Sequence, residues 1–163
     1  MRAICPGSFD PVTHGHLDII DRARHLFGDV VVAVGRNSSK NYLFSPDERQ
    51  AMLAEACAGR DGVAVVPLDG LLVDFCREHA CDVIVKGLRF AGDFEFELQM
   101  AQMNRSLTGI DTVLLPAAPR WASLSSTIIR EVASWGGDVS EFVPATVNTL
   151  IKAKIARRKE EGS

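Results

Sequence analysis

Short apolar runs alternate with helical patterns along almost the whole chain, and this alternation limits the possible folds more than any other feature. Five runs have the composition of buried strands, at 3–5, 30–34, 63–66, 83–85 and 112–115. Strands that are apolar throughout, rather than at every second residue, lie in sheets covered on both faces. The pattern therefore predicts an α/β fold with a Rossmann-like, doubly wound, five-stranded parallel sheet and helices on both faces.

Helices are expected at about 15–27, 71–79 and 92–107, from about 45, from about 126, and as a C-terminal helix from 144 to about 159. The helix near 45 begins with Ser45-Pro46-Asp47-Glu48, a capping box with proline at the first helical position. No repeat, low-complexity tract or linker is visible. With 163 residues, we expect a single domain spanning 1–163.

Composition and charge exclude several classes of protein. The net charge of −3 provides no basic field for nucleic acid, and the basic residues near the C-terminus are expected to form a solvated face. No apolar run is long enough to span a membrane, and the chain does not open with a signal peptide. The four cysteines lack zinc-site spacing, which predicts a reduced, cytoplasmic protein without a metal-ligating residue set.

The most informative motif follows the first predicted strand and reads Gly7-Ser8-Phe9-Asp10-Pro11-Val12-Thr13-His14-Gly15-His16. Strand, tight loop and helix N-terminus form an anion site when the first backbone N–H groups point outward. His16 could then donate to a phosphate oxygen as negative charge builds. His14 lies two positions from His16, so the two cannot share a metal as an i, i+4 pair can. The Thr-x-Gly-His pattern resembles the signature of the nucleotidyltransferase superfamily.

Basic residues follow several predicted strands. Lys40 follows the second predicted strand, and Lys86 and Arg89 follow the fourth. All three should reach the same edge of the sheet, where ligands of such sheets bind beyond the carboxyl ends of the strands. Convergent cations beside helix N-termini suit a polyphosphate. No Ser/His/Asp or Cys/His arrangement is visible, so we expect direct displacement without a covalent intermediate.

The helix expected at 92–107 carries a polar stripe between apolar faces. Asp93, Glu97 and Asn104 share one side, while aromatic residues, leucine and methionines occupy the others. A helix that is apolar on two sides should be deeply packed. The stripe must then meet a ligand, a partner or water, and the pattern leaves open whether Glu97 serves a ligand or a subunit interface.

Nearly the whole chain resembles the bacterial phosphopantetheine adenylyltransferase family. The matching pieces are 6–16, Lys40, Lys86-Gly87-Leu88-Arg89, Asp93-Phe94-Glu95-Phe96-Glu97, Met103-Asn104-Arg105, Ser125-Ser126-Thr127 and Gly137-Asp138-Val139. The resemblance implies transfer of the adenylyl group of ATP to 4'-phosphopantetheine, giving dephospho-coenzyme A and pyrophosphate. It also implies Mg²⁺ held mainly by the ATP phosphates, a homohexamer and inhibition by coenzyme A.

The resemblance also implies roles for individual residues. His16 would stabilise the transition state and contact ATP. The acceptor would be held by Ser8, Lys40, Leu72 and Lys86. The remaining ATP contacts would come from Ser8, Phe9, Gly87, Leu88, Arg89, Glu97, Trp121, Ala122, Ser123, Leu124, Ser125, Ser126 and Thr127.

Two alternatives stay open at this point. One is a nucleotidyltransferase with another acceptor, such as nicotinate mononucleotide, because a basic pocket fits either acceptor. Leu72 and Phe75 favour an acceptor with an extended, partly apolar arm. The other alternative is a non-catalytic sensor of coenzyme A or nucleotide, against which the intact His16 argues.

Overall fold

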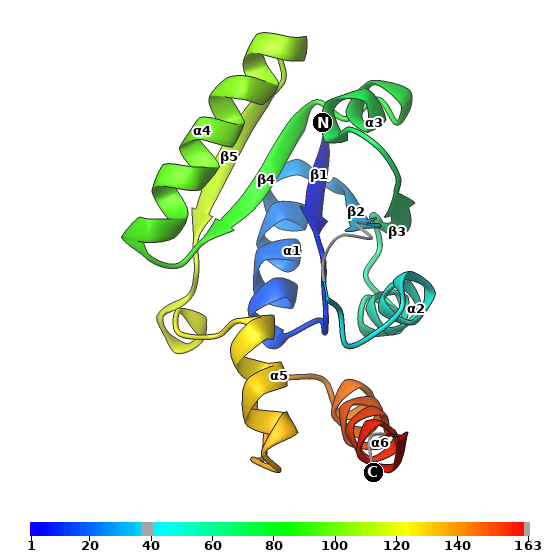
Figure 1. The fold of residues 1–163 in the computed structure, drawn as a ribbon. Coiled ribbons are helices and arrows are strands. Elements are labelled where there is room, and N and C mark those ends of the chain that lie inside the picture. Colours follow the sequence, from blue (N-terminus) through cyan, green and yellow to red (C-terminus); the bar gives the residue numbers. More distant parts are fainter. Residues whose placement is uncertain (37–40, 162–163) are drawn as a thin grey trace.

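Five parallel strands form one sheet in the order β3-β2-β1-β4-β5 (Figure 1). This computed structural model describes residues 1–36 and 41–161. The strand order reverses direction beside β1, as in doubly wound sheets, so the predicted fold class is confirmed. The strands are β1 (Arg2–Gly7), β2 (Asp29–Gly35), β3 (Val63–Leu68), β4 (Val83–Leu88) and β5 (Asp111–Pro116).

Each strand is longer than the apolar run that predicted it. In β1 the backbone pairing continues to Gly7, which lies opposite Val34, and in β4 it continues to Leu88, opposite Pro116. Apolar patterning reports the buried middle of a strand, whereas the ladder continues into polar and small residues. These extensions carry Gly7 and Lys86 to the carboxyl edge of the sheet.

The predicted helices are all present, with ends within a few residues of the expected ones. The capping box at α2 is confirmed, since Glu48 N donates to Ser45 Oγ at 3.2 Å and Ser45 N donates to Glu48 Oε2 at 2.7 Å. None of the helices in the described part of the chain is long and apolar enough to cross a membrane. The helices are α1 (His14–Phe27), α2 (Pro46–Ala56), α3 (Leu72–Glu78), α4 (Ala91–Thr108), α5 (Ser126–Ser134) and α6 (Ala145–Glu161), with a short 3₁₀ helix at Pro119–Trp121.

Alternate side chains of the strands enter two hydrophobic cores, one on each face of the sheet. On β2, Val30 and Val32 join the core under α1, α2, α5 and α6, while Val31 and Ala33 join the core under α3. Both faces are therefore covered, which explains why the strands are apolar at every position. In Figure 1 the strand arrowheads point toward α5, so the carboxyl edge of the sheet faces that helix.

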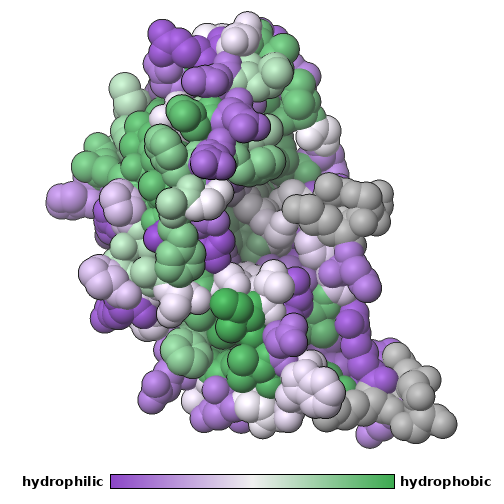
Figure 2. Space-filling model, turned by 60° about the vertical axis from the view of Figure 1, so that its left-hand side comes forward, coloured by the Kyte–Doolittle hydropathy of each residue, from purple (hydrophilic) through white to green (hydrophobic). Residues whose placement is uncertain are grey.

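The prediction that α4 is deeply packed is wrong for the single chain. Asn104 is the buried residue of this helix, whereas Phe96 is 62% exposed and Met103 is 56% exposed. The helix lies beside β4 and β5 (Figure 1) and also contacts α3, and these elements leave the Phe96 and Met103 side chains exposed. Figure 2 turns this side of the molecule forward. The upper half of that view shows apolar surface in green, interrupted by hydrophilic residues in purple.

The basic C-terminal helix also differs from the expectation of a solvated face. Lys154 Nζ lies 2.7 Å from Glu48 Oε1, and Arg158 donates to the carbonyl of Tyr42 at 2.9 Å. These contacts hold α6 against α2 and against the segment that precedes it. The helix therefore supports the loop between β2 and α2 rather than only facing water.

Candidate active site

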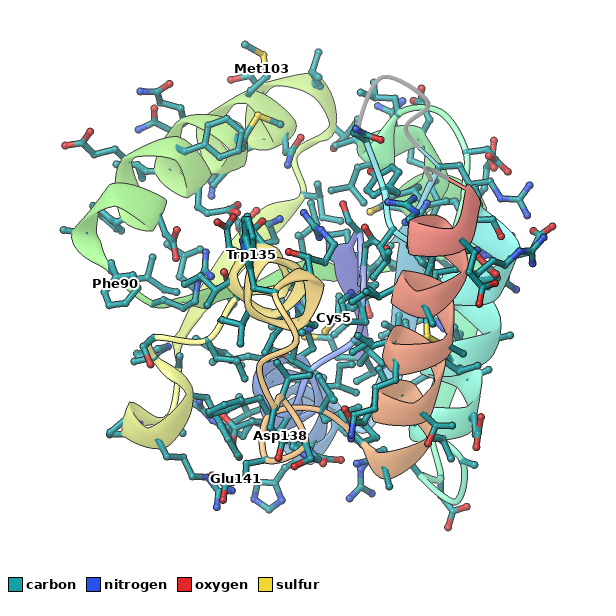
Figure 3. The ribbon with its side chains drawn as sticks, turned by 60° about the horizontal axis from the view of Figure 1, so that its bottom comes forward. Cys5, Phe90, Met103, Trp135, Asp138 and Glu141 are labelled. Carbon is teal, nitrogen blue, oxygen red and sulfur yellow. The ribbon has the colours of Figure 1, made fainter. Side chains whose placement is uncertain are left out.

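A cleft of about 320 Å³ opens at the carboxyl edge of β1 and β4, between the start of α1 and the start of α5. Figure 3 views this edge directly and shows Cys5 on β1 in the middle of the molecule, with helices around it. The predicted site residues that line the cleft come from four separate stretches of sequence: Phe9, His16, Lys86, Gly87, Arg89, Glu97, Trp121, Leu124, Ser125, Ser126 and Thr127.

The remaining predicted residues lie elsewhere or outside the described residues. Lys40 is among the residues that the structure does not describe. Ser8 follows β1, and its hydroxyl faces Tyr42. Leu88 ends β4, where its carbonyl accepts from Ala117 N. Ala122 and Ser123 lie in the turn before α5, away from the cleft lining, and Leu72 lines a second, smaller cavity.

The ring of His16 is held by an unusual capping box at the start of α1. Thr13 N donates to Nδ1 of His16 at 3.0 Å, while Thr13 Oγ1 accepts from His16 N at 3.3 Å. In most capping boxes a glutamate or glutamine reaches back to the N-cap backbone, and here histidine does so. Because Nδ1 accepts a hydrogen bond from the backbone amide, the neutral ring carries its own proton on Nε2.

The surroundings of His16 keep it neutral. Burial and, to a smaller extent, the positive charge of Arg89 together lower the pKa of this imidazole to about 4. Phe9 packs edge-on against the imidazole, with ring centroids 5.1 Å apart. His16 can therefore donate one hydrogen bond from Nε2 into the cleft at neutral pH without carrying charge.

The position of Phe9 depends on an unusual backbone. Phe9 has φ 49, in the left-handed region, and its side chain is buried. A Cβ at Gly7 would lie only 2.9 Å from the Phe9 ring, so glycine is required there. The Gly7-Ser8-Phe9 sequence thus turns the chain sharply enough to place a phenyl ring under the cleft.

The expectation that the first amides of α1 are free to bind an anion is only partly correct. His14 N donates to the carbonyl of Phe142 at 2.9 Å, and His16 N is used by Thr13. The start of α5 also faces the cleft, through Ser126 and Thr127. The positive end of the α5 dipole therefore adds to the anion-attracting character of the cleft.

Both basic side chains of the cleft are paired with carboxylates. Lys86 Nζ lies 3.2 Å from Glu97 Oε1, and Arg89 Nε lies 2.9 Å from Asp93 Oδ2. Burial alone would raise the pKa of Asp93, but the hydrogen bonds and charge of Arg89 outweigh it and hold that pKa below its usual value. Arg89 also donates to the Leu124 carbonyl at 3.2 Å, which ties the segment between β4 and α4 to the loop before α5.

A second cavity of about 80 Å³ adjoins the cleft and contains a residue that sequence reasoning left off the site. Lys86 and Glu97 line both spaces, while Leu72 and Asn104 line the smaller one. Asn104 is 5% exposed, and its spacing of seven residues from Glu97 was the signal that could have placed it there. Phe75, in contrast, is packed in the core and stacked on His79 at 3.8 Å.

Sequence reasoning also left Asp10 and Thr13 without a role. Asp10 is buried, accepts from Leu43 N and Phe44 N at 2.8 and 2.9 Å, and pairs with Arg130 at 3.4 Å. It therefore joins three parts of the site: the loop after β1, the segment before α2, and α5. The threonine three residues before a helical histidine was a visible capping signal.

The cysteine nearest the cleft is not set up as a nucleophile. Burial, followed by the neighbouring Cys57, raises the pKa of the Cys5 thiol to about 12. Among the described residues, no group of three histidine, cysteine, aspartate or glutamate side chains could hold a metal ion. The cleft therefore offers hydrogen-bond donors, cations and a neutral histidine, which suit binding and positioning of phosphates.

Comparisons with known proteins agree with this chemistry. A family model described as cytidylyltransferase-like matches residues 4–132. A phosphopantetheine adenylyltransferase of Nocardioides sp. is 54% identical over 95% of this chain and 98% of the relative. Proteins of the same name from Cutibacterium acnes and Micrococcus luteus are 54% and 56% identical, covering 93% and 90% of this chain and 96% and 94% of the relatives. The chain belongs to the phosphopantetheine adenylyltransferase family.

Two solved structures support the fold of this family. A putative nicotinate-nucleotide adenylyltransferase from Vibrio parahaemolyticus superimposes with a TM-score of 0.71 at 21% identity, covering 96% of this chain and 94% of that one. A lipopolysaccharide core biosynthesis protein from Thermoplasma volcanium gives a TM-score of 0.53 at 22% identity, covering 72% and 96%. At such identities the likeness concerns the fold alone. The Rossmann-like architecture expected of the family is thus confirmed.

Proposed function

We propose that this protein transfers the adenylyl group of ATP to 4'-phosphopantetheine, giving dephospho-coenzyme A and pyrophosphate. The observation that carries the proposal is His16, a neutral histidine fixed as an Nε2 donor in a cleft at the carboxyl edge of the sheet. Membership of the phosphopantetheine adenylyltransferase family supports this assignment of donor and acceptor.

In the proposed reaction, the phosphate of the acceptor attacks the α-phosphorus of ATP as pyrophosphate leaves. The attacking phosphate already carries negative charge, so no side chain has to activate it. The protein aligns the two substrates and stabilises the charge that develops between them. His16 Nε2 donates to an α-phosphate oxygen, and the start of α5 and Arg89 face the triphosphate.

Lys86 and the second cavity support an acceptor with a long arm. We place the phosphate of the acceptor beside Lys86, which lines both spaces. The arm then extends toward Leu72 and Asn104, where apolar surface and a buried amide suit a chain of methylene and amide groups. Lys40 and Ser8 complete the acceptor site in this proposal.

Mg²⁺ is proposed as a partner of ATP rather than as an ion held by the protein. The two carboxylates near the cleft, Glu97 and Asp93, are paired with cations, and Asp10 is occupied by two amides and Arg130. This donor set fits an ion bound through phosphate oxygens, since Mg²⁺ commonly keeps few protein ligands. When bound, the ion neutralises charge on the leaving pyrophosphate.

The oligomeric state, the inhibition by coenzyme A and the cellular compartment are also proposals. We expect a homohexamer in which the exposed apolar side of α4 is covered by another subunit, because large apolar patches on single chains mark interfaces. We expect coenzyme A, which contains the adenylyl and phosphopantetheine parts of the two substrates, to inhibit by occupying the cleft. The four free cysteines support a reducing compartment, and we assign the protein to the cytoplasm.

The decisive test measures pyrophosphate release from ATP with 4'-phosphopantetheine, with nicotinate mononucleotide and with no acceptor. We expect release only with 4'-phosphopantetheine and Mg²⁺. Release only with nicotinate mononucleotide would mean that this compound, and not 4'-phosphopantetheine, is the acceptor. Binding of ATP or coenzyme A without any release would favour a sensor.

A further inference from the structure

Arg49 is a fully buried cation that the proposed reaction does not use. It projects from α2 with 0% of its surface exposed, and no carboxylate of the described residues lies within ion-pair distance. Its Nε and Nη2 atoms are buried without a hydrogen-bond partner. Burying a cation in this way is costly, so the position calls for a function beyond packing.

The one nitrogen of Arg49 that is satisfied joins two loops of the site. Nη1 donates to the carbonyl of Ser8 at 2.6 Å and to the carbonyl of Gly35 at 2.9 Å. Ser8 follows β1 and Gly35 ends β2, so the guanidinium fixes the distance between the loops that leave these neighbouring strands.

Tyr42 completes the arrangement from the other side of the guanidinium. The ring of Tyr42 lies under Arg49, with Cζ 4.1 Å from the ring centroid, and its hydroxyl is 3.3 Å from the hydroxyl of Ser8. Arg158 donates to the carbonyls of residues 42 and 43, and Asp10 accepts from the amides of residues 43 and 44, so the backbone around Tyr42 is held on both sides. The Tyr42 ring is therefore fixed in place before any substrate arrives.

We propose that Tyr42 and Arg49 are positioning residues that orient the hydroxyl of Ser8 toward the phosphate of the acceptor. A phosphate oxygen can only accept, so Ser8 must donate its hydrogen to the substrate. Its oxygen is then free to accept from Tyr42, and the two hydroxyls form a chain in which each bond strengthens the next. The Oγ–Oη distance of 3.3 Å leaves room for this chain to tighten on binding.

This inference rests on the proposed function, since it takes Ser8 to contact the acceptor. The test is a double-mutant cycle with Tyr42→Phe, Ser8→Ala and the double variant. Phenylalanine keeps the ring under Arg49 and removes only the hydroxyl, while the Ser8 carbonyl that Arg49 holds survives in Ser8→Ala. Thr149→Val, which removes an exposed hydroxyl from α6, is the matched control.

We expect Tyr42→Phe to raise the KM for the acceptor about 3- to 10-fold with a smaller change in kcat. In the Ser8→Ala background the same substitution should change KM less than about 2-fold, because its partner is gone. Equal effects in both backgrounds, or none in either, would overturn the inference. Arg49→Lys should lower kcat/KM further, and the tyrosine substitution remains decisive if that variant does not fold.

A second readout does not depend on catalysis. Tyr42 is the single tyrosine of the chain, so tyrosine labelled with ¹³C at Cζ gives one resonance that reports on its hydroxyl. Ser8→Ala should shift this resonance, and Thr149→Val should leave it in place. An unmoved resonance in Ser8→Ala would overturn the contact itself, whereas an inactive wild-type enzyme with a shifted resonance would count against the proposed function only.

Discussion

The ammonium nitrogen of Lys86 lies 3.2 Å from the Oε1 carboxylate oxygen of Glu97, so two side chains that the sequence analysis assigned to different substrates contact each other. Both are mostly buried, at 28% and 17% side-chain exposure. An acceptor phosphate that approaches Lys86 must therefore share it with Glu97. The pair couples the two substrate sites, because a change in one partner alters the charge that the other presents.

Glu97→Gln should weaken ATP binding while leaving the acceptor site intact or improved. The glutamine keeps the shape of the side chain but removes its charge, which costs about 1–2 kcal/mol of ATP binding and releases Lys86 for the acceptor phosphate. Calorimetry with each substrate measures both effects. Glu95→Gln, on the exposed side of α4, is the control. Unaltered ATP affinity together with smaller species in sedimentation would instead assign Glu97 to a subunit interface.

Lys86→Ala should act mainly on the acceptor. A charge-assisted contact to phosphate contributes roughly 1.5–3 kcal/mol, so the KM for 4'-phosphopantetheine should rise at least about tenfold, with a smaller change for ATP. Steady-state kinetics with each substrate varied in turn separates the two. The double variant with Glu97→Gln should lose less than the sum of the single losses, since the residues are in contact. A loss of ATP affinity alone would reverse the assignment.

His16→Ala should slow turnover and leave ATP binding nearly unchanged. Loss of one preorganised donor to developing charge raises the barrier by about 3 kcal/mol, or roughly two orders of magnitude in rate. Single-turnover rates and ATP affinity by calorimetry test this directly. His25→Ala, in the exposed last turn of α1, should behave as wild type. A kcat near the wild-type value in His16→Ala would contradict the proposed role of His16 in stabilising the transition state.

The free enzyme should keep His16 neutral well below pH 6. Its pKa in the folded state is about 4, below the unfolded value of 6.5, so between these two pH values the unfolded chain binds more protons. Stability should therefore fall as the pH drops from 6.5 toward 4, at up to about 1.4 kcal/mol per pH unit from this group. Proton–nitrogen correlation spectra should show the Nε2–H tautomer and a midpoint near 4. A midpoint near 6.5 would contradict the desolvated geometry in which Nδ1 accepts from Thr13 N and Nε2 donates.

The sequence was sufficient to predict the fold and most of the residues that line the cleft. Continuous apolar strands such as 30–34 require a sheet covered on both faces, and in a parallel sheet the residues after each strand meet at one edge. His16, Lys86 and Arg89 were therefore placed correctly, although they come from distant parts of the chain.

The packing of a helix against other elements and the partners of charged side chains could not be predicted from the sequence in the same way. Periodicity shows that α4 has apolar sides, but it does not say whether the chain itself covers them, and here it leaves Phe96 and Met103 exposed. Likewise, a basic residue at a strand end predicts a cation at the edge and not its partner. The Asp10–Arg130 pair and the contacts of Arg49 join residues far apart in sequence, and no local pattern reports them.

The exposed apolar side of α4 should be an interface between copies of this chain. Phe96, Met103 and Leu107 on this side, and Phe90 just before the helix, are between 50% and 62% exposed, and Figure 3 shows Phe90 and Met103 near opposite ends of the helix. Met103→Glu would place a charge where a partner removes water, and should raise the dissociation constant of the assembly by about tenfold or more. Gln102→Glu adds the same charge at a neighbouring polar position and is the control. Sedimentation velocity across a concentration series measures the shift, and identical assemblies for wild type and Met103→Glu would place the interface elsewhere.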